Sequence, residues 1–295
     1  MPSLSIVLAT THRWPEVEPT LDAIFAAEPV DMEVILCDGN GGGAPPPERF
    51  DDRLRVISMP GTSVFELRAR GVGEAAGDVV TITEDHCLPA PDWPREMLAA
   101  HERHPDAIAV AGAVTNASAA DLWDCANFLL TFAEHLPPMP SKPTVRAPSV
   151  ANGSVKRVPA EIPSDPEPGW FETQLMPRLV SEGQAARDDG PRVAHVQSHG
   201  SARATLAAHF HNGRATTGLR AQPPGLRALA SERARIVRLP LRLTRETRAA
   251  LADRPPLTGQ EARGARLVPV VALAHTAGEL TGLLAGPGRS AELLD

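Results

Sequence analysis

The sequence contains no tyrosine, and aromatic residues make up only 4% of its 295 residues. A core built mainly from aromatic rings is therefore excluded. Hydrophobic residues of all kinds still account for 42% of the chain, so alanine, valine, leucine and isoleucine must fill the interior. A chain of this length is long enough for one large α/β domain, or for one domain with a substantial appendage.

Basic residues are outnumbered by acidic ones. Lysine and arginine together number 29 against 36 aspartates and glutamates, which gives a formal net charge of −7. Sequence-independent binding of DNA needs a basic surface, so we expect no nucleic-acid partner.

Cysteines are few, and the chain starts without a leader-like pattern. Cys37, Cys87 and Cys125 are odd in number and lack the spacing of metal ligands, which favours reduced thiols in a cytoplasmic protein. The first residues have no charged region followed by a long apolar run, so we expect no signal peptide. The apolar run at 4–9 is far too short to span a bilayer.

Short apolar runs alternate with segments of helical spacing along most of the chain. This alternation predicts an α/β fold with a mostly parallel sheet that is covered by helices on both faces. The predicted strands are 4–9, 32–37, 54–58, 78–83, 107–114 and 192–199. The predicted helices begin at Pro15 and continue with 63–77, 91–104, 169–183 and 201–214. Ligands bind at the carboxyl ends of parallel strands, which makes the polar residues there candidates for a site: Thr10, Asp38, Glu84, Asp85 and His86.

The composition changes toward the C-terminus. Residues 136–148 are rich in proline, which predicts a loop or a flap. After about residue 220 the chain has the pattern of a helical appendage. We therefore expect a first domain at 1–220 and a helical region at 221–295.

The helical region has two unusual segments, which we interpret as two helices. Residues 233–248 hold six arginines interleaved with aliphatic residues, and 267–286 is apolar and long enough to span a membrane. Glu279 would be costly at the centre of a bilayer, which argues against a span. The basic segment is typical of an amphipathic helix on an anionic membrane surface. Packing on the sheet, or on a second subunit in a homo-oligomer, would explain it equally well.

The segment at 77–89, "GDVVTITEDHCLP", ends a predicted strand with three polar residues. Taken alone, Glu84, Asp85 and His86 could be the solvated end of that strand. The segment nevertheless resembles the metal-binding strand of family 2 glycosyltransferases, inverting enzymes with a GT-A fold, which often read G-D-strand-D-x-D-C-x-P. The resemblance implies that Glu84 and Asp85 contact the nucleotide and that His86 replaces an aspartate that usually binds a divalent metal. Imidazole suits Mn²⁺ better than Mg²⁺, so Asp85 is a second candidate for metal ligation.

Further motifs of the same family follow in the expected order over about residues 3–214. "LRARGVGEAAG" is similar to A-R-N-x-G-x-x-x-A-x-G, which implies that Arg68 reaches the nucleotide or its phosphates, with alanine at 69 in place of asparagine. "VILCDGNG" resembles the second strand of the family and implies that Asp38 contacts the base or ribose. The resemblance also implies that Thr10 and Thr11 lie in the first nucleotide-binding loop. Taken alone, Asp38 would be assigned to a turn.

Two downstream motifs complete the resemblance. "FETQLMPRLVSEG" is similar to E-D-x-x-L-x-x-R-L-x-x-x-G and implies that Glu172 is the catalytic base, with Phe171 in place of a glutamate. By itself, Glu172 could also be an acid that interacts with a helix dipole. "HVQSHGS" resembles the terminal strand that ends in a metal- or phosphate-binding histidine, for which we choose His199 first and His195 second.

The resemblance implies an inverting glycosyltransferase that uses Mn²⁺ or Mg²⁺ and moves a sugar from a nucleotide-diphosphate donor to an acceptor hydroxyl. The acceptor is expected to be lipid-linked or a polysaccharide, with the enzyme in the cytoplasm or at the inner face of the membrane. Two alternatives stay open. A nucleotidyltransferase would need a glycine- and lysine-rich phosphate loop, which "TTHRWP" lacks. A sugar-nucleotide-binding protein with a decayed site would explain the residues that depart from the motifs, which are Ala69, His86 and Phe171.

Overall fold

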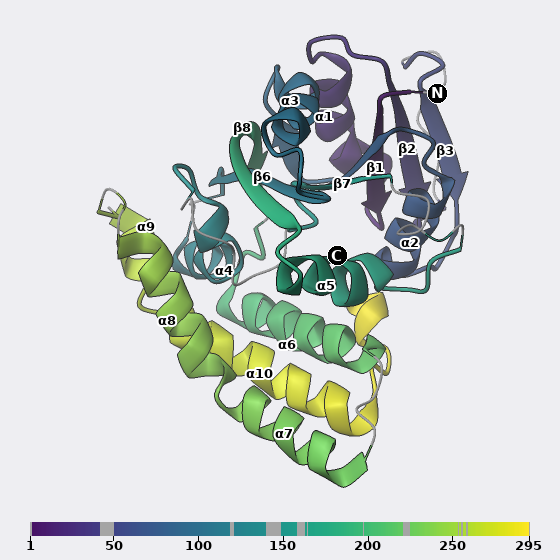
Figure 1. Cartoon of the computed structure of the whole chain (residues 1–295). Helices are drawn as coiled ribbons and strands as arrows, with labels where there is room; N and C mark the ends of the chain where they lie inside the picture. The colour runs from purple at the N-terminus through teal and green to yellow at the C-terminus, as the bar shows by residue number, and fades with distance from the viewer. Residues whose placement is uncertain are drawn as a thin grey trace. The chain divides into compact units, whose positions relative to one another are not determined.

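The structure is a computed structural model with two compact units. The first unit comprises residues 1–115 and 135–196, and the second comprises 116–134 and 197–294. Figure 1 labels the α-helices of both units and most of the strands. The structure describes residues 2–41, 50–118, 121–139, 149–157, 163, 165–196, 198–220, 225–252, 254, 256–257 and 259–294.

The first unit is built on an eight-stranded sheet. The strands follow the order β3-β2-β1-β4-β7-β6-β8-β5. Their bounds are β1 Leu4–Thr10, β2 Met32–Asp38, β3 Leu54–Ser58, β4 Val79–Glu84, β5 Cys87–Pro89, β6 Ala109–Asn116, β7 Gly153–Lys156 and β8 Ala185–His195. The α/β fold predicted from the alternating pattern is thereby confirmed, and the sheet is mixed.

One half of this sheet is parallel. β1 pairs in parallel with β2 and β4, and β2 pairs in parallel with β3. The seven residues of β1 are all buried, as expected for a strand covered on both faces. The register places Ala9 opposite Glu84 and Thr10 opposite Asp38. The polar residues that end these strands therefore lie at one edge of the sheet.

The other half is antiparallel, which the sequence did not predict. β7 pairs antiparallel with β4 and β6, and β5 pairs antiparallel with β8. β7 lies within "NGSVKR", a short segment that lacks the long apolar run of a typical core strand. Its residues Gly153, Ser154 and Val155 are nevertheless buried. Small residues and satisfied hydroxyl groups allow this, since Ser154 Oγ donates to the carbonyl of Val110.

Helices cover this sheet. α2 (Val64–Glu74) packs on β1 and β2, α1 (Trp14–Phe25) packs beside β5, and α3 (Trp93–Arg103) packs on β8. A short π-helical turn, η3 (Phe171–Leu175), continues into α5 (Met176–Ser181). Phe171, Leu175 and Met176 join β1, β2 and β4 side chains in one hydrophobic cluster. Ser63 is the N-cap of α2, and its amide donates to the Glu66 carboxylate at 3.1 Å.

The second unit is helical. α4 begins at an Asp121 cap, whose carboxylate accepts from the amides of Trp123 and Asp124. A 3₁₀ turn, η2 (Ala133–His135), follows α4, and another, η4 (Ser290–Leu293), follows α10. The helices are α4 Leu122–Phe132, α6 Ala202–Leu219, α7 Gly225–Val237, α8 Leu239–Ala252, α9 Gly259–Gly264 and α10 Val268–Ala285.

α6 and α10 form a closely packed pair. Four glycines lie where the two helices meet or where α6 meets the residues after α10, and an added Cβ at any of them would collide with backbone atoms of the facing segment. These glycines are Gly213, Gly218, Gly278 and Gly282. Their missing side chains let the two backbones approach. The sequence predicted that the helix ends near Gly213, but that glycine is a packing position and α6 continues to Leu219.

The division of the chain differs from the predicted one. The boundary was expected near residue 220, whereas the first unit ends at 196 and α6 belongs to the helical unit. The close pairing of α6 with α10 accounts for this. The C-terminal region contains α7, α8, α9 and α10 rather than two helices. Pro240 lies in the first turn of α8, a position that proline favours, so the arginine-rich segment is split between two helices.

α10 is long and apolar enough to cross a membrane by length and composition, and 39% of it is buried within the structure. A core helix of a globular protein meets the same criteria. Glu279 of α10 is buried, and its carboxylate lies 3.0 Å from Arg235 of α7 and 3.4 Å from His275. The charge that made a membrane span costly is thus paired inside the helical unit.

Candidate functional site

Near the strand ends of the first unit, three side chains that could bind a metal ion lie close together. The carboxylate of Glu84 at the end of β4 lies 3.5 Å from Nε2 of His86 and 3.7 Å from Nε2 of His195. Among the residues that the structure describes, these three side chains are the one group of His, Cys, Asp and Glu whose ligand atoms all lie within 4.8 Å of one another. One carboxylate and two imidazoles form a donor set for a divalent transition metal.

Strand pairing explains how His195 reaches this group. Cys87 of β5 lies opposite His195 of β8, and the amide of Val196 donates to the carbonyl of His86 at 2.9 Å. The two imidazole rings pack edge to face, with centroids 4.8 Å apart. His195 was the second choice after His199 in the sequence. The structure brings His195 to Glu84, a contact that depends on the antiparallel pairing of β5 with β8.

Asp85 orients its neighbours and lies outside the group. Its Oδ1 lies 2.9 Å from Nδ1 of His86, while its Oδ2 accepts from the Thr10 hydroxyl and lies 2.7 Å from Nδ1 of His12. His86 is thereby held through Nδ1, which leaves Nε2 directed toward Glu84. Carboxylates that fix a metal-binding histidine in this manner are common in metal sites. Asp85 was the second candidate for metal ligation in the sequence, and that role stays a prediction. In the structure its oxygens contact His12, His86 and Thr10.

His12 is a site residue that sequence reasoning missed. It follows Thr10 and Thr11 directly after β1, and its amide donates to the Thr10 hydroxyl at 3.0 Å. The available signal was its place at the carboxyl end of a parallel strand. Thr11 contributes a buried hydroxyl that has no hydrogen-bond partner among the described residues.

Arg68 joins the metal-type group to the predicted base. Its guanidinium donates to Glu84 at 3.0 Å and to Glu172 at 3.2 Å. The three side chains are 11%, 15% and 14% exposed, so they are accessible to a small ligand without being free in solvent. Within the described part of the chain, Nε of Arg68 and Oε2 of Glu172 are buried without a hydrogen-bond partner. The cluster therefore has unused donor and acceptor capacity, which is typical of a binding site.

The charged groups of this cluster shift the pKa values of their neighbours. Burial disfavours ionisation of Glu84, but a hydrogen bond from His86 and the charges of His86, Arg68 and His195 outweigh burial and lower its pKa to about 2. Burial also opposes protonation of His86, yet hydrogen bonds to Asp85 and Glu84 raise its pKa to about 9. Burial raises the pKa of Glu172, and the Arg68 charge only partly offsets that effect. The site thus favours an ionised Glu84 beside cationic groups, whereas burial disfavours ionisation of Glu172.

A short π-helical turn positions Glu172. Gly169 has a φ of 73°, a left-handed conformation that other residues rarely adopt, and its carbonyl accepts from the amide and hydroxyl of Thr173. π-Helical turns often occur at functional sites. Phe171, the departure from the family motif next to Glu172, is buried in the hydrophobic cluster. Ala69, the departure next to Arg68, is also buried.

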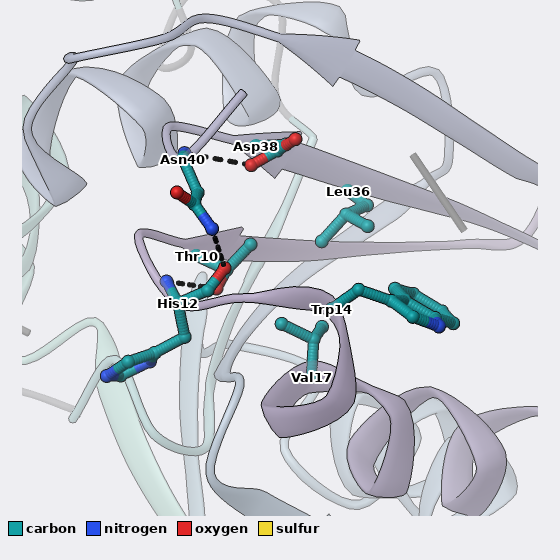
Figure 2. A pocket seen from close by; sticks show the side chains of 7 residues that line it. All are labelled: Thr10, His12, Trp14, Val17, Leu36, Asp38 and Asn40. Atoms are coloured by element: carbon teal, nitrogen blue, oxygen red, sulfur yellow. Dashed lines mark hydrogen bonds between the residues drawn. The ribbon is translucent and has the colours of Figure 1, made fainter. Parts of the chain in front are cut away.

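A pocket lies beside this cluster at the ends of β1 and β2, and Figure 2 shows its lining. The lining residues are Thr10, His12, Trp14, Val17, Leu36, Asp38 and Asn40. Asp38 accepts hydrogen bonds from the amides of Asn40 and Gly41, which makes it the turn residue that its sequence suggested. It also lies in the pocket wall, as its predicted contact with a nucleotide requires.

His199 belongs to the second unit. Its amide donates to the Asp124 carboxylate at 3.0 Å, and Ser198 donates to the same carboxylate. The group around Glu84 is drawn entirely from the first unit, so metal ligation by His199 stays a prediction. Most of the proline-rich segment, at 140–148, lies outside the described residues.

Residues 5–136 match the profile of the family described as glycosyl transferase family 2. This segment is thus similar to glycosyltransferase family 2. The matched residues include β1, β2, α2 and β4, with Thr10, Asp38, Arg68 and Glu84. The resemblance that the sequence motifs carried is confirmed.

Two known proteins also resemble this chain. A glucosyl-dolichyl phosphate glucuronosyltransferase from Haloferax volcanii is 28% identical over 38% of this chain and 38% of its own length. The chain thus matches well under half of that relative. The solved structure of a mannosyltransferase from Pyrobaculum calidifontis, in complex with GDP-mannose and Mn²⁺, aligns with a TM-score of 0.58 at 17% identity. It covers 95% of this chain and 87% of the mannosyltransferase, which supports the GT-A fold.

Proposed function

We propose that this protein is an inverting, metal-dependent glycosyltransferase that moves a sugar from a nucleotide-diphosphate donor to an acceptor hydroxyl. The contact of Arg68 with both Glu84 and Glu172 carries this proposal. Through this contact, Arg68, a candidate for phosphate binding, links Glu84 of the possible metal site to Glu172, the candidate base. The cluster lies near the carboxyl ends of the strands, where ligands of parallel sheets bind.

The pocket beside β1 and β2 is the proposed site of the nucleoside. Asp38 and Asn40 offer polar groups there, and Trp14 adds an aromatic wall. Arg68 is suited to the diphosphate because a guanidinium pairs well with phosphate oxygens. The Pyrobaculum mannosyltransferase is described with GDP-mannose, which supports a nucleotide sugar as the donor. The name of the Haloferax relative supports a lipid-linked acceptor, but a polysaccharide acceptor fits the site equally well.

The residues of the first unit fit a divalent cation. Glu84, His86 and His195 offer three ligand atoms, and Asp85 holds His86 in a ligating orientation. Two imidazoles favour Mn²⁺ or a similar transition metal over Mg²⁺, which prefers oxygen ligands. When bound, such a cation would stabilise the charge that develops on the departing diphosphate. The Mn²⁺ complex of the Pyrobaculum mannosyltransferase supports this assignment.

Glu172 is the proposed base. Its unpartnered Oε2 can accept the proton of an acceptor hydroxyl, whose oxygen then attacks the anomeric carbon on the side opposite the leaving diphosphate. One bond to the anomeric carbon forms while the bond to the diphosphate breaks, which inverts the configuration. Arg68 pairs with Glu172 in the structure and would contact the diphosphate of a bound donor.

Calorimetric titration with UDP and GDP, with and without Mn²⁺, tests the proposal. We expect one of the nucleotides to bind at least about tenfold more tightly with Mn²⁺, because a cation held by Glu84, His86 and His195 would neutralise charge on the diphosphate. The variants H86A and H195A should abolish the Mn²⁺ effect. H104A is the matched control, because His104 pairs with Asp188 away from the group.

A screen of nucleotide sugars for metal-dependent hydrolysis then separates an enzyme from a binding protein. Hydrolysis of one donor supports the transferase. Metal-dependent binding of a nucleotide, without hydrolysis or transfer, would instead identify a non-catalytic sugar-nucleotide-binding protein. If Mn²⁺ changed neither nucleotide binding nor donor hydrolysis, the metal-dependent proposal would be wrong.

A further inference from the structure

The helical unit carries an exposed surface on α7 and α8 that the transferase site does not use. We call it the basic face, and it consists of Arg233, Val237, Arg238, Leu241, Arg242, Arg245 and Arg248. All seven side chains are exposed. Val237 and Leu241 are 66% and 72% exposed, and they are the two most exposed large hydrophobic residues of the described chain.

Helical spacing separates this surface from the inner side of the same helices. Ile236, Leu239 and Thr247 are buried and point toward the interior of the unit. On the outer side, Leu241, Arg245 and Arg248 follow one another at intervals of four and three residues. This interval places them on one stripe of α8. The sequence therefore builds an amphipathic surface, and the structure leaves its mixed basic and aliphatic side exposed.

The charge of the basic face is opposite to that of the protein as a whole. Residues 225–252 contain seven arginines and two glutamates, although the chain has a formal net charge of −7. Arg235 turns inward and pairs with Glu232 and Glu279. Arg242 lies 3.4 Å from Glu246. Within the described residues, the remaining four arginines of the basic face form no ion pair with a carboxylate. An anionic partner would complement them.

The exposed aliphatic residues decide which anionic partner fits. A nucleic acid would use the arginines but would gain little from Val237 and Leu241, because its backbone is polar and charged. An anionic bilayer uses both features, since arginines contact phosphate head groups while aliphatic side chains enter the boundary with the acyl chains. The aliphatic stems of the arginines can also lie along that boundary.

We propose that the basic face docks on the surface of an anionic lipid bilayer. α7 and α8 would lie in the interface plane, with Val237 and Leu241 inserted at head-group depth. α10 does not take part, because its Glu279 is held in the interior by Arg235 and His275. The docking does not depend on the transferase chemistry. If the basic face did not bind vesicles, the proposed function would still stand, because donor binding and hydrolysis are measured without lipid.

Flotation of the full chain with vesicles tests the proposal. The vesicles are phosphatidylcholine alone or phosphatidylcholine mixed with phosphatidylglycerol, at low and physiological salt. We expect binding only to the anionic vesicles, with an affinity that falls as salt rises. Each arginine near such a surface contributes about fivefold to the partition constant, so R238Q/R245Q should lower it by about 25-fold.

A matched control removes the same charge elsewhere in the helical unit. R203Q/R289Q changes two exposed arginines outside the basic face and should lower partitioning by less than about threefold. L241N should lower partitioning by about tenfold without changing the charge, because it removes an inserted aliphatic side chain. If R238Q/R245Q and R203Q/R289Q lowered partitioning onto the vesicles equally, only the net charge of the protein would matter. That result would overturn the proposed docking of the basic face.

Two other partners give distinct outcomes. If the protein bound a labelled DNA duplex as tightly as the anionic vesicles, and L241N left both unchanged, the face would be a nucleic-acid site. If sedimentation showed a dimer that dissociated in L241N, and the protein did not bind vesicles, the face would be a contact between copies of the chain. Either result would overturn the membrane proposal.

Discussion

The two units of this protein each bury a carboxylate beside an arginine and a histidine, but the two clusters differ in how completely they are satisfied. In the helical unit, Glu279 is almost fully buried and is surrounded by Arg235, His275 and the charge of Arg220. In the α/β unit, Arg68 is shared by two carboxylates, and atoms of both Arg68 and Glu172 have no hydrogen-bond partner among the residues that the structure describes.

This difference separates a structural ion cluster from a binding site. Burial disfavours the charged form of Glu279, but the hydrogen bond from His275 and the charges of His275, Arg220 and Arg235 outweigh it and lower its pKa to about 2. A single carboxylate with an excess of cations needs no ligand. In the site cluster, two carboxylates share one arginine and two imidazoles lie beside Glu84, which leaves capacity for a cation and a phosphate.

The strongest test of the site cluster is E172Q. The glutamine keeps the size of the side chain and can still accept from Arg68, but it cannot act as a base. We expect the rate of sugar transfer to fall by about 10²- to 10⁴-fold while the affinity for the donor nucleotide stays nearly unchanged. Transfer assays and calorimetry measure the two quantities.

E182Q is the matched control for this variant. Glu182 lies in the same segment, is exposed and pairs with Arg178, so its loss should change neither quantity. Normal turnover by E172Q would show that another group is the base.

The corresponding change in the helical unit should affect stability and leave the site intact. E279Q leaves Arg235 and Arg220 without their buried carboxylate, and we expect the free energy of unfolding of that unit to fall by about 3 kcal/mol. Urea denaturation monitored by circular dichroism measures the loss. E292Q is the control, since Glu292 forms an exposed pair with Arg289 and should cost under about 0.5 kcal/mol. A loss of metal-dependent nucleotide binding in E279Q would break the proposed contrast between the two clusters.

The orienting role of Asp85 gives a smaller effect. D85N weakens the hold on His86 and His12, so we expect the affinity for Mn²⁺ to fall by about 10- to 100-fold with the fold preserved. Calorimetry or the paramagnetic signal of Mn²⁺ measures it. D188N, which disturbs the pairing of Asp188 with Arg103 and His104, should leave the affinity for Mn²⁺ unchanged. An unchanged affinity in D85N would remove Asp85 from the site.

Lowering the pH should reduce the stability of the helical unit, because His209 becomes protonated when the unit unfolds. Burial, together with the charges of His275 and His199, lowers the pKa of His209 to about 3, and its Nε2 lies 2.7 Å from the Asn127 side-chain oxygen. A histidine whose pKa is depressed by folding contributes stability above its unfolded pKa of about 6.5, and this contribution is lost as the pH falls. We expect about 2 kcal/mol to be lost between pH 6.5 and pH 5.

Hydrogen exchange resolved by unit isolates this effect, because His101 in the α/β unit also has a lowered pKa, of about 4. Glu279 does not contribute in this window, since both its folded and unfolded pKa values lie below pH 5. H209Q keeps an N–H donor for Asn127 and should flatten the pH dependence of the helical unit. An unchanged slope in H209Q would exclude His209 as the titrating group.

Local patterns in the sequence predicted the parallel half of the sheet and the polar residues at its edge. β1, β2 and β4 are mainly apolar, and side chains that follow parallel strands must gather at one edge. Thr10, Asp38 and Glu84 could therefore be placed together before the structure was known. The motif around Arg68 identified the helix that faces them, and its serine cap was also predictable because capping depends on neighbouring residues.

The sequence by itself determined which side chains end the parallel strands and that the chain carries a basic amphipathic segment. Only the tertiary structure decided that His195 meets Glu84, because that contact depends on the antiparallel pairing of β5 with β8, two strands about a hundred residues apart. The same holds for Asp85, whose oxygens are taken by His12, His86 and Thr10, and for α6, which joins α10 through glycines on both helices. Contacts between distant segments depend on packing, and no local pattern of residues encodes them.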